Sequence, residues 1–254
     1  MIHPSAIIHP SAEIGSDCEI GPFCVIGEHV SLGQGNRLHS HVVVDGHTSM
    51  GQGNEIFPFA TIGLRTQDLK WEGGKTCTQV GDRNTIRENV TVHSATSAGN
   101  KTVIGSDNHL LAYAHVAHDV QLGNHIIMSN GATLAGHIVV EDHAVISGLA
   151  GVHQFCRIGR FAIVGGFSKV VQDVPPFMLV DGNPAKTKTI NKVALERHGF
   201  NEEVQTALKK AFKILFRSGL NTENAIERIE KEIPPLPEIS HLLAFMRGSR
   251  RGVA

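Results

Sequence analysis

The stretch Ile104–Val170 reads IGSDNHLLAYAHVAHDVQLGNHIIMSNGATLAGHIVVEDHAVISGLAGVHQFCRIGRFAIVGGFSKV, and every sixth residue in it is aliphatic or methionine. These positions are Ile104, Leu110, Val116, Leu122, Met128, Leu134, Val140, Ile146, Val152, Ile158, Val164 and Val170. A period of six fits neither an amphipathic helix, at about 3.6 residues per turn, nor a simple strand, at about 2. It is typical of a solenoid, in which each repeat buries its apolar face only against stacked neighbours.

The same rule runs from Ile2 to Ile62 and returns at Val80, Ile86 and Val92. The residue two places before each aliphatic position is usually small, and the residue after it is often glycine. We expect two inward side chains per repeat and a turn conformation supplied by that glycine. Three strands and three corners then give a triangular coil of about 18 residues, which rises about 4.8 Å on the previous coil.

The repeat predicts a β-helical domain over residues 1–185, with loops at 64–78 and 93–102 where the rule fails. The first loop contains the only tryptophan of the chain, and long loops inside a compact repeat are often functional. Residues 186–254 change to a helical period and predict a small α-helical domain. Asn201 is expected to cap a helix that stops at Gly219, Thr222 to begin a second, and Leu242 to lie in a third.

Composition narrows the class of protein. The net charge is −1, which suggests neither nucleic acid nor a membrane surface as a partner. Residues 186–254 contain 13 Lys or Arg and 8 Asp or Glu, whereas residues 1–185 contain 10 and 16. No targeting segment precedes the repeat and no apolar run has the length of a membrane span, so we expect a cytoplasmic protein. Cys18, Cys24 and Cys156 occupy the small position, which predicts core packing.

Histidines gather where stacked coils share one corner. Residues 18 apart occupy equivalent places, so Val116, Leu134 and Val152 share a face. The histidines that follow these three positions project near one corner, joined by His93 if the second loop is an excursion, and they are His118, His137 and His153. Imidazole can take a proton near neutral pH, as the activation of a sugar hydroxyl requires. No serine or cysteine has a nucleophile's setting, which favours direct transfer over a covalent intermediate.

Several motifs together resemble those of the UDP-N-acetylglucosamine O-acyltransferases, a hexapeptide-repeat family whose reaction is the first step of lipid A synthesis. The motifs are QDLK (67–70), AHVAHD (114–119), LAGH (134–137), HQFC (153–156), QDVPP (172–176) and RHGF (197–200). The resemblance spans essentially the whole chain. It implies a left-handed parallel β-helix followed by the helical domain, and a homotrimer with its site between neighbouring prisms.

The resemblance also implies a role for each matching residue. His118 becomes the general base on the glucosamine 3-hydroxyl, Asp119 supports it, and the Gly136 N–H becomes the oxyanion donor. Residues implied around the sugar and acyl chain are Asp68, Lys70, His93, His115, His137, His153 and Gln154. Asn191 and Arg197 match positions that hold the nucleotide, and Gly166 matches the far end of the acyl groove, where its missing side chain implies a long acyl chain.

The implied substrates are UDP-N-acetylglucosamine and a 3-hydroxyacyl thioester of acyl carrier protein, an acidic partner suited to the basic residues of the first long tail helix. No cofactor and no metal are implied. Two departures concern the nucleotide and phosphate contacts, because His198 and Ser94 stand where the family usually has arginine. The sequence leaves open whether the acceptor group is a 3-hydroxyl or a 3-amine, since one base serves both.

Three other interpretations remain open from the sequence. A zinc enzyme of the γ-carbonic anhydrase type uses the same fold, with His115 and His118 as ligands, but leaves QDLK and the helical tail unexplained. The related N-acyltransferase of the same pathway carries a sizeable domain before its repeats, which here begin at Ile2. A non-catalytic scaffold would transfer no acyl group from any thioester.

Overall fold

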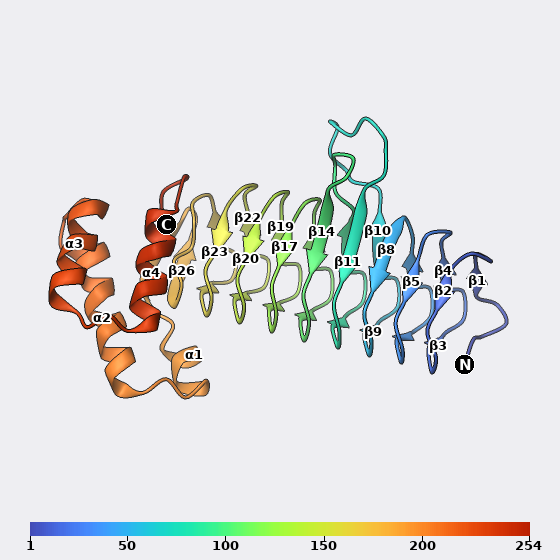
Figure 1. Cartoon of the computed structure of the whole chain (residues 1–254), viewed down its shortest axis with the longest axis horizontal. Helices are drawn as coiled ribbons and strands as arrows, with labels where there is room; N and C mark the ends of the chain where they lie inside the picture. Colours follow the sequence, from blue (N-terminus) through green and yellow to red (C-terminus); the bar gives the residue numbers. More distant parts are fainter.

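The computed structural model describes residues 1–254, and the six-residue repeat forms a three-sided prism with one parallel sheet on each face (Figure 1). Face 1 consists of β1 Ile7–Ile8, β4 Val25–Ile26, β7 Val43–Val44, β10 Thr61–Leu64, β13 Thr91–His93, β16 His115–Val116, β19 Thr133–Leu134, β22 Gly151–Val152 and β25 Lys169–Val170. Face 2 consists of β2 Glu13–Ile14, β5 Ser31–Leu32, β8 His47–Met50, β11 Cys77–Val80, β14 Lys101–Ile104, β17 Gln121–Leu122, β20 Val139–Val140 and β23 Arg157–Ile158. Face 3 consists of β3 Glu19–Ile20, β6 Arg37–Leu38, β9 Glu55–Ile56, β12 Thr85–Ile86, β15 His109–Leu110, β18 Ile127–Met128, β21 Val145–Ile146, β24 Ile163–Val164, β26 Met178–Gly182 and β27 Ala185–Ile190.

The predicted coil is confirmed. Val116 pairs in register with Leu134, and Leu134 with Val152, so residues 18 apart stack as expected. The aliphatic positions point inward and form one continuous core along the prism, which also contains the buried small residues Cys24 and Cys156. The prism is a left-handed parallel β-helix, and its strands are short because each one turns a corner after two inward side chains.

The turn role expected for the glycine after each aliphatic residue is wrong. The left-handed conformation lies two residues further on and is taken by residues such as Asp17, Phe23 and His41, with φ of 59°, 60° and 59°. A Cβ on Gly15 would instead lie 2.6 Å from the carbonyl carbon of Gly33 in the next coil. The glycines are therefore required by the close stacking of coils.

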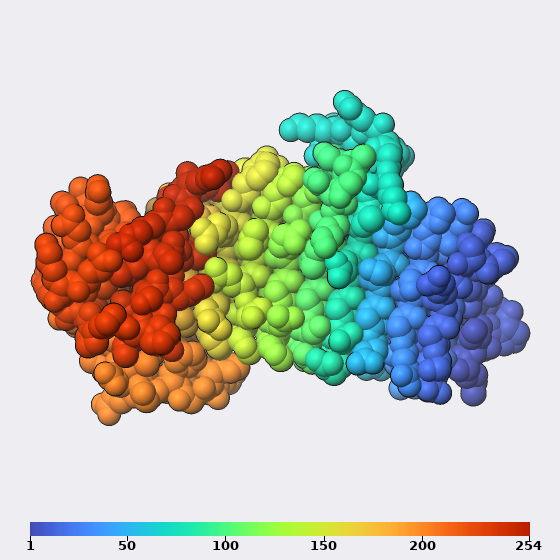
Figure 2. All heavy atoms as spheres, viewed as in Figure 1, coloured from blue at the N-terminus to red at the C-terminus, as the bar shows by residue number.

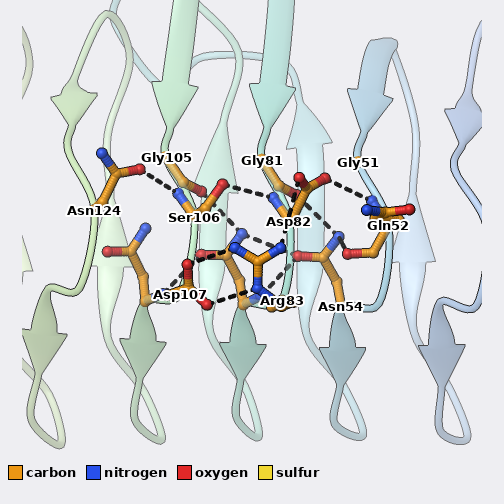
Figure 3. Close-up of polar contacts among 12 residues, drawn as sticks. Gly51, Gln52, Asn54, Gly81, Asp82, Arg83, Gly105, Ser106, Asp107 and Asn124 are labelled. Carbon is orange, nitrogen blue, oxygen red and sulfur yellow. Dashed lines mark hydrogen bonds and ion pairs between the residues drawn. The ribbon is translucent and has the colours of Figure 1, made fainter.

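Polar ladders reinforce the corner between faces 2 and 3, which we call the asparagine corner (turns 51–54, 81–84, 105–108, 123–126, 141–144 and 159–162). Asn54 Oδ1 accepts from the backbone N–H and the side-chain amide of Asn84, both at 2.9 Å. On the outer side, Asp82 Oδ1 accepts from Gln52 N at 2.8 Å, and Ser106 Oγ accepts from Asp82 N at 2.9 Å (Figure 3). These side chains satisfy corner N–H groups that the strands leave unpaired.

Two loops leave the prism between faces 1 and 2. They span residues 65–76 and 94–100, slightly shorter than predicted, because β10, β11, β13 and β14 are extended strands of three or four residues. Val92 pairs with Val116, so the second loop is an excursion as the histidine argument required.

The end of the prism carries an antiparallel hairpin of β26 and β27 that the sequence did not reveal, so strand residues continue past 185. Four helices follow: α1 Lys192–Arg197, α2 Glu202–Arg217, α3 Thr222–Glu232 and α4 Pro237–Arg247. Asn201 caps α2 as predicted, accepting from Val204 N at 2.9 Å. The helices pack on Phe161, Phe177 and Met178 of the prism end.

No helix combines the length and apolarity that a membrane crossing needs. The division into two domains remains a prediction.

Candidate active site

The candidate site lies on the corner between faces 1 and 2, which we call the histidine corner (turns 117–120, 135–138, 153–156 and 171–174, and both excursions). The structure brings His118 and His137 together from adjacent coils, with ring centroids 5.1 Å apart and planes at 87°. The sequence placed these two residues on one corner, and the stacking of Val116 on Leu134 is the reason that they meet.

Asp119 holds the His118 ring in one orientation. His118 Nδ1 lies 2.9 Å from Asp119 Oδ2, and a carboxylate there accepts a hydrogen bond from an N–H at Nδ1. The other ring nitrogen, Nε2, is then the unprotonated one and is directed away from Asp119. The His118 side chain is 12% exposed and that of Asp119 7%, so the ring is reachable and its partner is not.

The second excursion fixes Asp119. Thr96 N donates to Asp119 Oδ2 at 3.0 Å, and Asn100 Nδ2 donates to Oδ1 at 3.3 Å. The backbone N–H of Asp119 donates to Thr102 Oγ1 at 2.8 Å. Sequence reasoning missed these three residues, of which Thr96 and Asn100 lie in the excursion and Thr102 lies in β14.

The first excursion brings Asp68 to the open side of His118. Asp68 Oδ2 lies 3.7 Å from His118 Nε2. The backbone N–H of Lys70 donates to Asp68 Oδ1 and lowers the pKa of that carboxyl, and the nearby His118 lowers it further. Thr66 Oγ1 and Thr96 Oγ1 lie 3.1 Å apart and join the two excursions, which stand together on the prism surface (Figure 2).

Gly136 lies directly against His118. A Cβ on Gly136 would lie 2.2 Å from His118 Cε1 and 2.4 Å from Nε2, so only glycine leaves room for the ring in this position. The Gly136 N–H donates to no backbone or side-chain acceptor in the chain. A free N–H therefore lies beside the free ring nitrogen.

His93 and His115 form a second pair, with ring centroids 5.0 Å apart. Burial lowers the pKa of His93 to about 4, and His115 and His118 act in the same direction. Burial also lowers the pKa of His115, whose Nδ1 lies 2.6 Å from Thr91 Oγ1. Both rings are therefore neutral at pH 7.

The depressed pKa of His93 predicts acid sensitivity. Between about pH 6.5, its ordinary value, and about pH 4, its folded value, the unfolded chain binds a proton that the folded chain does not. The stability contributed above pH 6.5 is therefore lost as the pH falls, by about 2–3 kcal/mol in all. His93→Gln should flatten the dependence of the unfolding free energy on pH over this window. Parallel pH curves for the two proteins would refute the assignment.

The structure leaves other predicted residues away from His118 within one chain. His153 and Gln154 are exposed, two coils further along the histidine corner, and Lys70 is exposed in the first excursion. Asn191 and Arg197 belong to the cap and last turn of α1, beside the asparagine corner. Both polar atoms of Asn191 are used there, because Oδ1 accepts from Ala194 N and Nδ2 donates to Phe161 O.

The structure also places Gly166, His198 and Ser94. Gly166 is exposed on the corner between faces 3 and 1, and a Cβ there would meet only Gly148 O, at 3.4 Å. His198 packs its ring on His143 and Phe161, with centroids 4.9 and 5.0 Å away. Ser94 is buried and accepts from Thr76 Oγ1 at 3.2 Å, which ties the two excursions together.

One group of residues has the spacing of metal ligands. Nitrogen or oxygen atoms of His118, Asp119 and His137 lie within 4.8 Å of one another. Asp119 already accepts hydrogen bonds on both oxygens, and His115, a ligand in the zinc interpretation, is not in the group. The arrangement suits a carboxylate–imidazole pair for proton transfer better than a ligand set.

Comparisons with known proteins agree with this geometry. The family model described as UDP N-acetylglucosamine O-acyltransferase, domain 2, matches residues 173–254, and the bacterial transferase hexapeptide model matches residues 11–46 and 101–136. An acyl-[acyl-carrier-protein]–UDP-N-acetylglucosamine O-acyltransferase of Thermodesulfovibrio yellowstonii is 52% identical over 253 residues, covering 99% of this chain and 98% of the relative.

Solved structures give the same result for the fold. The UDP-N-acetylglucosamine acyltransferase of Bacteroides fragilis superposes with a TM-score of 0.98 at 40% identity, covering 100% of both chains. LpxA of Acinetobacter baumannii superposes with a TM-score of 0.96 at 43% identity, covering 100% of this chain and 99% of that one. The resemblance predicted from the sequence motifs is confirmed, and the chain is an enzyme of the UDP-N-acetylglucosamine O-acyltransferase family.

Proposed function

We propose that this protein transfers a 3-hydroxyacyl chain from an acyl carrier protein thioester to the 3-hydroxyl of UDP-N-acetylglucosamine, the first step of lipid A biosynthesis. The observation that carries the proposal is the geometry at His118. Its Nδ1 is held by the buried Asp119, its Nε2 faces the open corner, and the unpaired Gly136 N–H lies beside it. The names of the relatives supply the substrate class.

In this mechanism His118 Nε2 removes the proton of the sugar hydroxyl as its oxygen attacks the thioester carbonyl. The Gly136 N–H stabilises the oxyanion of the tetrahedral intermediate, and Asp119 stabilises the imidazolium. Collapse of the intermediate breaks the carbon–sulfur bond, and His118 returns the proton to the departing thiolate. Base and oxyanion donor each contribute about two to three orders of magnitude in rate.

A homotrimer with the site between prisms is part of the proposal. The corner between faces 3 and 1 exposes a row of large apolar side chains, Phe23, Phe59, Tyr113, Leu149 and Phe167, each more than half exposed. Large apolar side chains exposed at intervals along one corner favour its burial against another chain. Arg197 also lies by the asparagine corner while His118 lies on the histidine corner. A shared site would therefore take these residues from two copies.

Acyl carrier protein is the proposed donor protein. The exposed side of α2 carries the basic residues Lys209, Lys210, Lys213 and Arg217. Lys210 is neutralised by Glu232 at 3.0 Å, which leaves the others to attract an acidic partner and to raise its association rate.

The function is tested with purified protein, UDP-N-acetylglucosamine, its 3-amino analogue and a series of 3-hydroxyacyl thioesters of acyl carrier protein. We expect O-acylation of the natural sugar nucleotide and a trimeric mass at micromolar concentration. A lack of transfer from every thioester would reject the enzyme, preference for the amine would reassign the acceptor, and a monomeric mass would reject the shared site.

Chain length is expected to depend on Gly166. Open space beyond this residue should let the acyl groove continue, so the protein prefers about fourteen carbons to ten. Four buried methylenes contribute roughly 3 kcal/mol, or about a hundredfold in preference. Gly166→Met should move the preference to the shorter donor without unfolding the chain, because Gly166 has no left-handed φ and its Cβ would meet only Gly148 O, at 3.4 Å. Competition assays with the ten- and fourteen-carbon donors test this role of Gly166. An equal loss of activity toward both chain lengths would mean that Gly166 serves only the turn.

A further inference from the structure

The segment 249–254 returns from α4 to the last coil of the prism. Ser249 Oγ donates to Asp173 Oδ2 at 2.8 Å, and Ala254 N donates to Asp173 O at 2.9 Å. Thr187 Oγ1 donates to Ala254 O, and Ala254 is buried in the prism core. The segment is therefore fixed on the histidine corner by contacts that do not involve Arg251.

Arg251 is the side chain that this segment brings to the corner. Its Nη2 lies 3.3 Å from His153 Nδ1 and 3.4 Å from Val171 O. The Arg251 side chain is exposed, and no carboxylate lies within ion-pair distance of it. Asp173, the acid nearest in sequence, is buried and accepts from Ser249 and from Arg157 N. Arg251 is thus a held cation without a counter-charge.

His153 adds a second hydrogen-bonding group to the same place. Its Nδ1 faces Arg251 and the Gln154 carbonyl, 3.1 Å away, which leaves Nε2 without a partner in the chain. A fixed guanidinium beside a free ring nitrogen is a suitable pair for the oxygens of a phosphate.

We infer that Arg251 and His153 form a subsite for the phosphate of the phosphopantetheine arm that carries the acyl donor. The inference rests on the proposed function. Arg251 lies near the coil of Val170, three coils from the coil of His118, a distance of about 14 Å at about 4.8 Å per coil. The arm from thioester sulfur to phosphate spans about 15 Å when extended. A thioester attacked at His118 therefore places its phosphate at Arg251.

The diphosphate of the sugar nucleotide is the other phosphate in the reaction, and it does not fit this distance. Only the width of one sugar ring separates the diphosphate from the reacting 3-hydroxyl. That width is less than the rise of two coils, which is about 10 Å. The corner between His118 and Arg251 also presents an apolar surface, since Phe155 is 52% exposed and stacks on His137 at 4.7 Å. The gem-dimethyl part of the pantetheine arm suits such a surface.

The experiment compares the full-length protein with Arg251→Ala, Arg251→Lys and the matched control Arg250→Ala, an exposed neighbour outside the subsite. The donors are one 3-hydroxyacyl group as its phosphopantetheine thioester and as its pantetheine thioester, which lacks the phosphate. The wild type should have a KM about tenfold to a hundredfold lower for the phosphorylated donor. Arg251→Ala should abolish that difference, Arg251→Lys should retain part of it, and Arg250→Ala should retain all of it.

Melting temperatures check that the return segment stays in place in each variant. A rise in KM in Arg251→Ala that is equal for both donors would overturn the phosphate assignment. An increase confined to the KM for UDP-N-acetylglucosamine would overturn it in favour of the nucleotide diphosphate. If the wild type transfers no acyl group from either thioester or from acyl carrier protein, the proposed function fails before the variants are compared, and this inference fails with it.

Discussion

His118→Ala is expected to lower kcat by about two to four orders of magnitude, because it removes the proposed general base for the attacking hydroxyl. Its Nε2 is the ring nitrogen that faces the open corner, with Asp68 Oδ2 at 3.7 Å and no closer acceptor. Asp68 has a lowered pKa, so it is a weaker base than an imidazole near neutral pH. The rate that remains would come from Gly136 and from substrate positioning.

The fold should survive this substitution. The His118 side chain takes no part in the strand ladder, in which β16 pairs with β13 and β19 through backbone groups and Val116. The melting temperature should therefore change little while kcat falls. His9→Ala is a matched control, since His9 is exposed and its ring contacts only Ser11. Retention of more than a tenth of the wild-type rate by His118→Ala would reject the base assignment.

The prism was predictable from the sequence because one physical constraint repeats. A residue such as Val116 must point inward in every coil, and the burial of aliphatic side chains imposes the period of six. Handedness was not predictable from this pattern and came only from the resemblance. The β26–β27 hairpin was missed because it buries alternate residues over a single short pair of strands, which gives no repeat to detect.

The proximity of His118 and Gly136 was predictable from the sequence, whereas the hydrogen bonds that hold Asp119 were not. The stacking of equivalent residues was enough to bring His118 to Gly136. The contacts of Thr96 and Asn100 with Asp119 depend on the path of an irregular excursion, whose conformation no periodicity encodes. Asn191 shows a further limit. The family resemblance assigns it to the nucleotide, but in the folded chain both of its polar atoms bind neighbouring backbone groups.

Glycine was also misread, since the sequence cannot tell a glycine needed for its φ from one needed for a close approach. Gly15 and Gly136 both have ordinary φ and both lie against the next layer of atoms. Gly15 faces the backbone of Gly33, whereas Gly136 faces the side chain of His118. This difference predicts opposite consequences for the same substitution.

Gly136→Ala is expected to lower kcat by about two to three orders of magnitude with little loss of stability. The new methyl group would lie 2.2 Å from His118 Cε1, so the ring must rotate away from the place that Asp119 gives it. A displacement of about 1 Å in a catalytic group costs about a hundredfold in rate, and a disturbed oxyanion donor costs a similar factor. Because a side chain rather than the backbone moves, the coils remain stacked.

Gly15→Ala supplies the opposite control. Its methyl group would meet the Gly33 carbonyl carbon at 2.6 Å, and two coils must separate to admit it. We expect this variant to lose melting temperature and to keep its kcat per folded molecule, whereas Gly136→Ala keeps its melting temperature and loses kcat. Steady-state rates and thermal unfolding of the two variants decide between them. A Gly136→Ala protein that melts early and turns over normally would show that Gly136 serves the stacking of coils, as Gly15 does, and would remove it from the catalytic site.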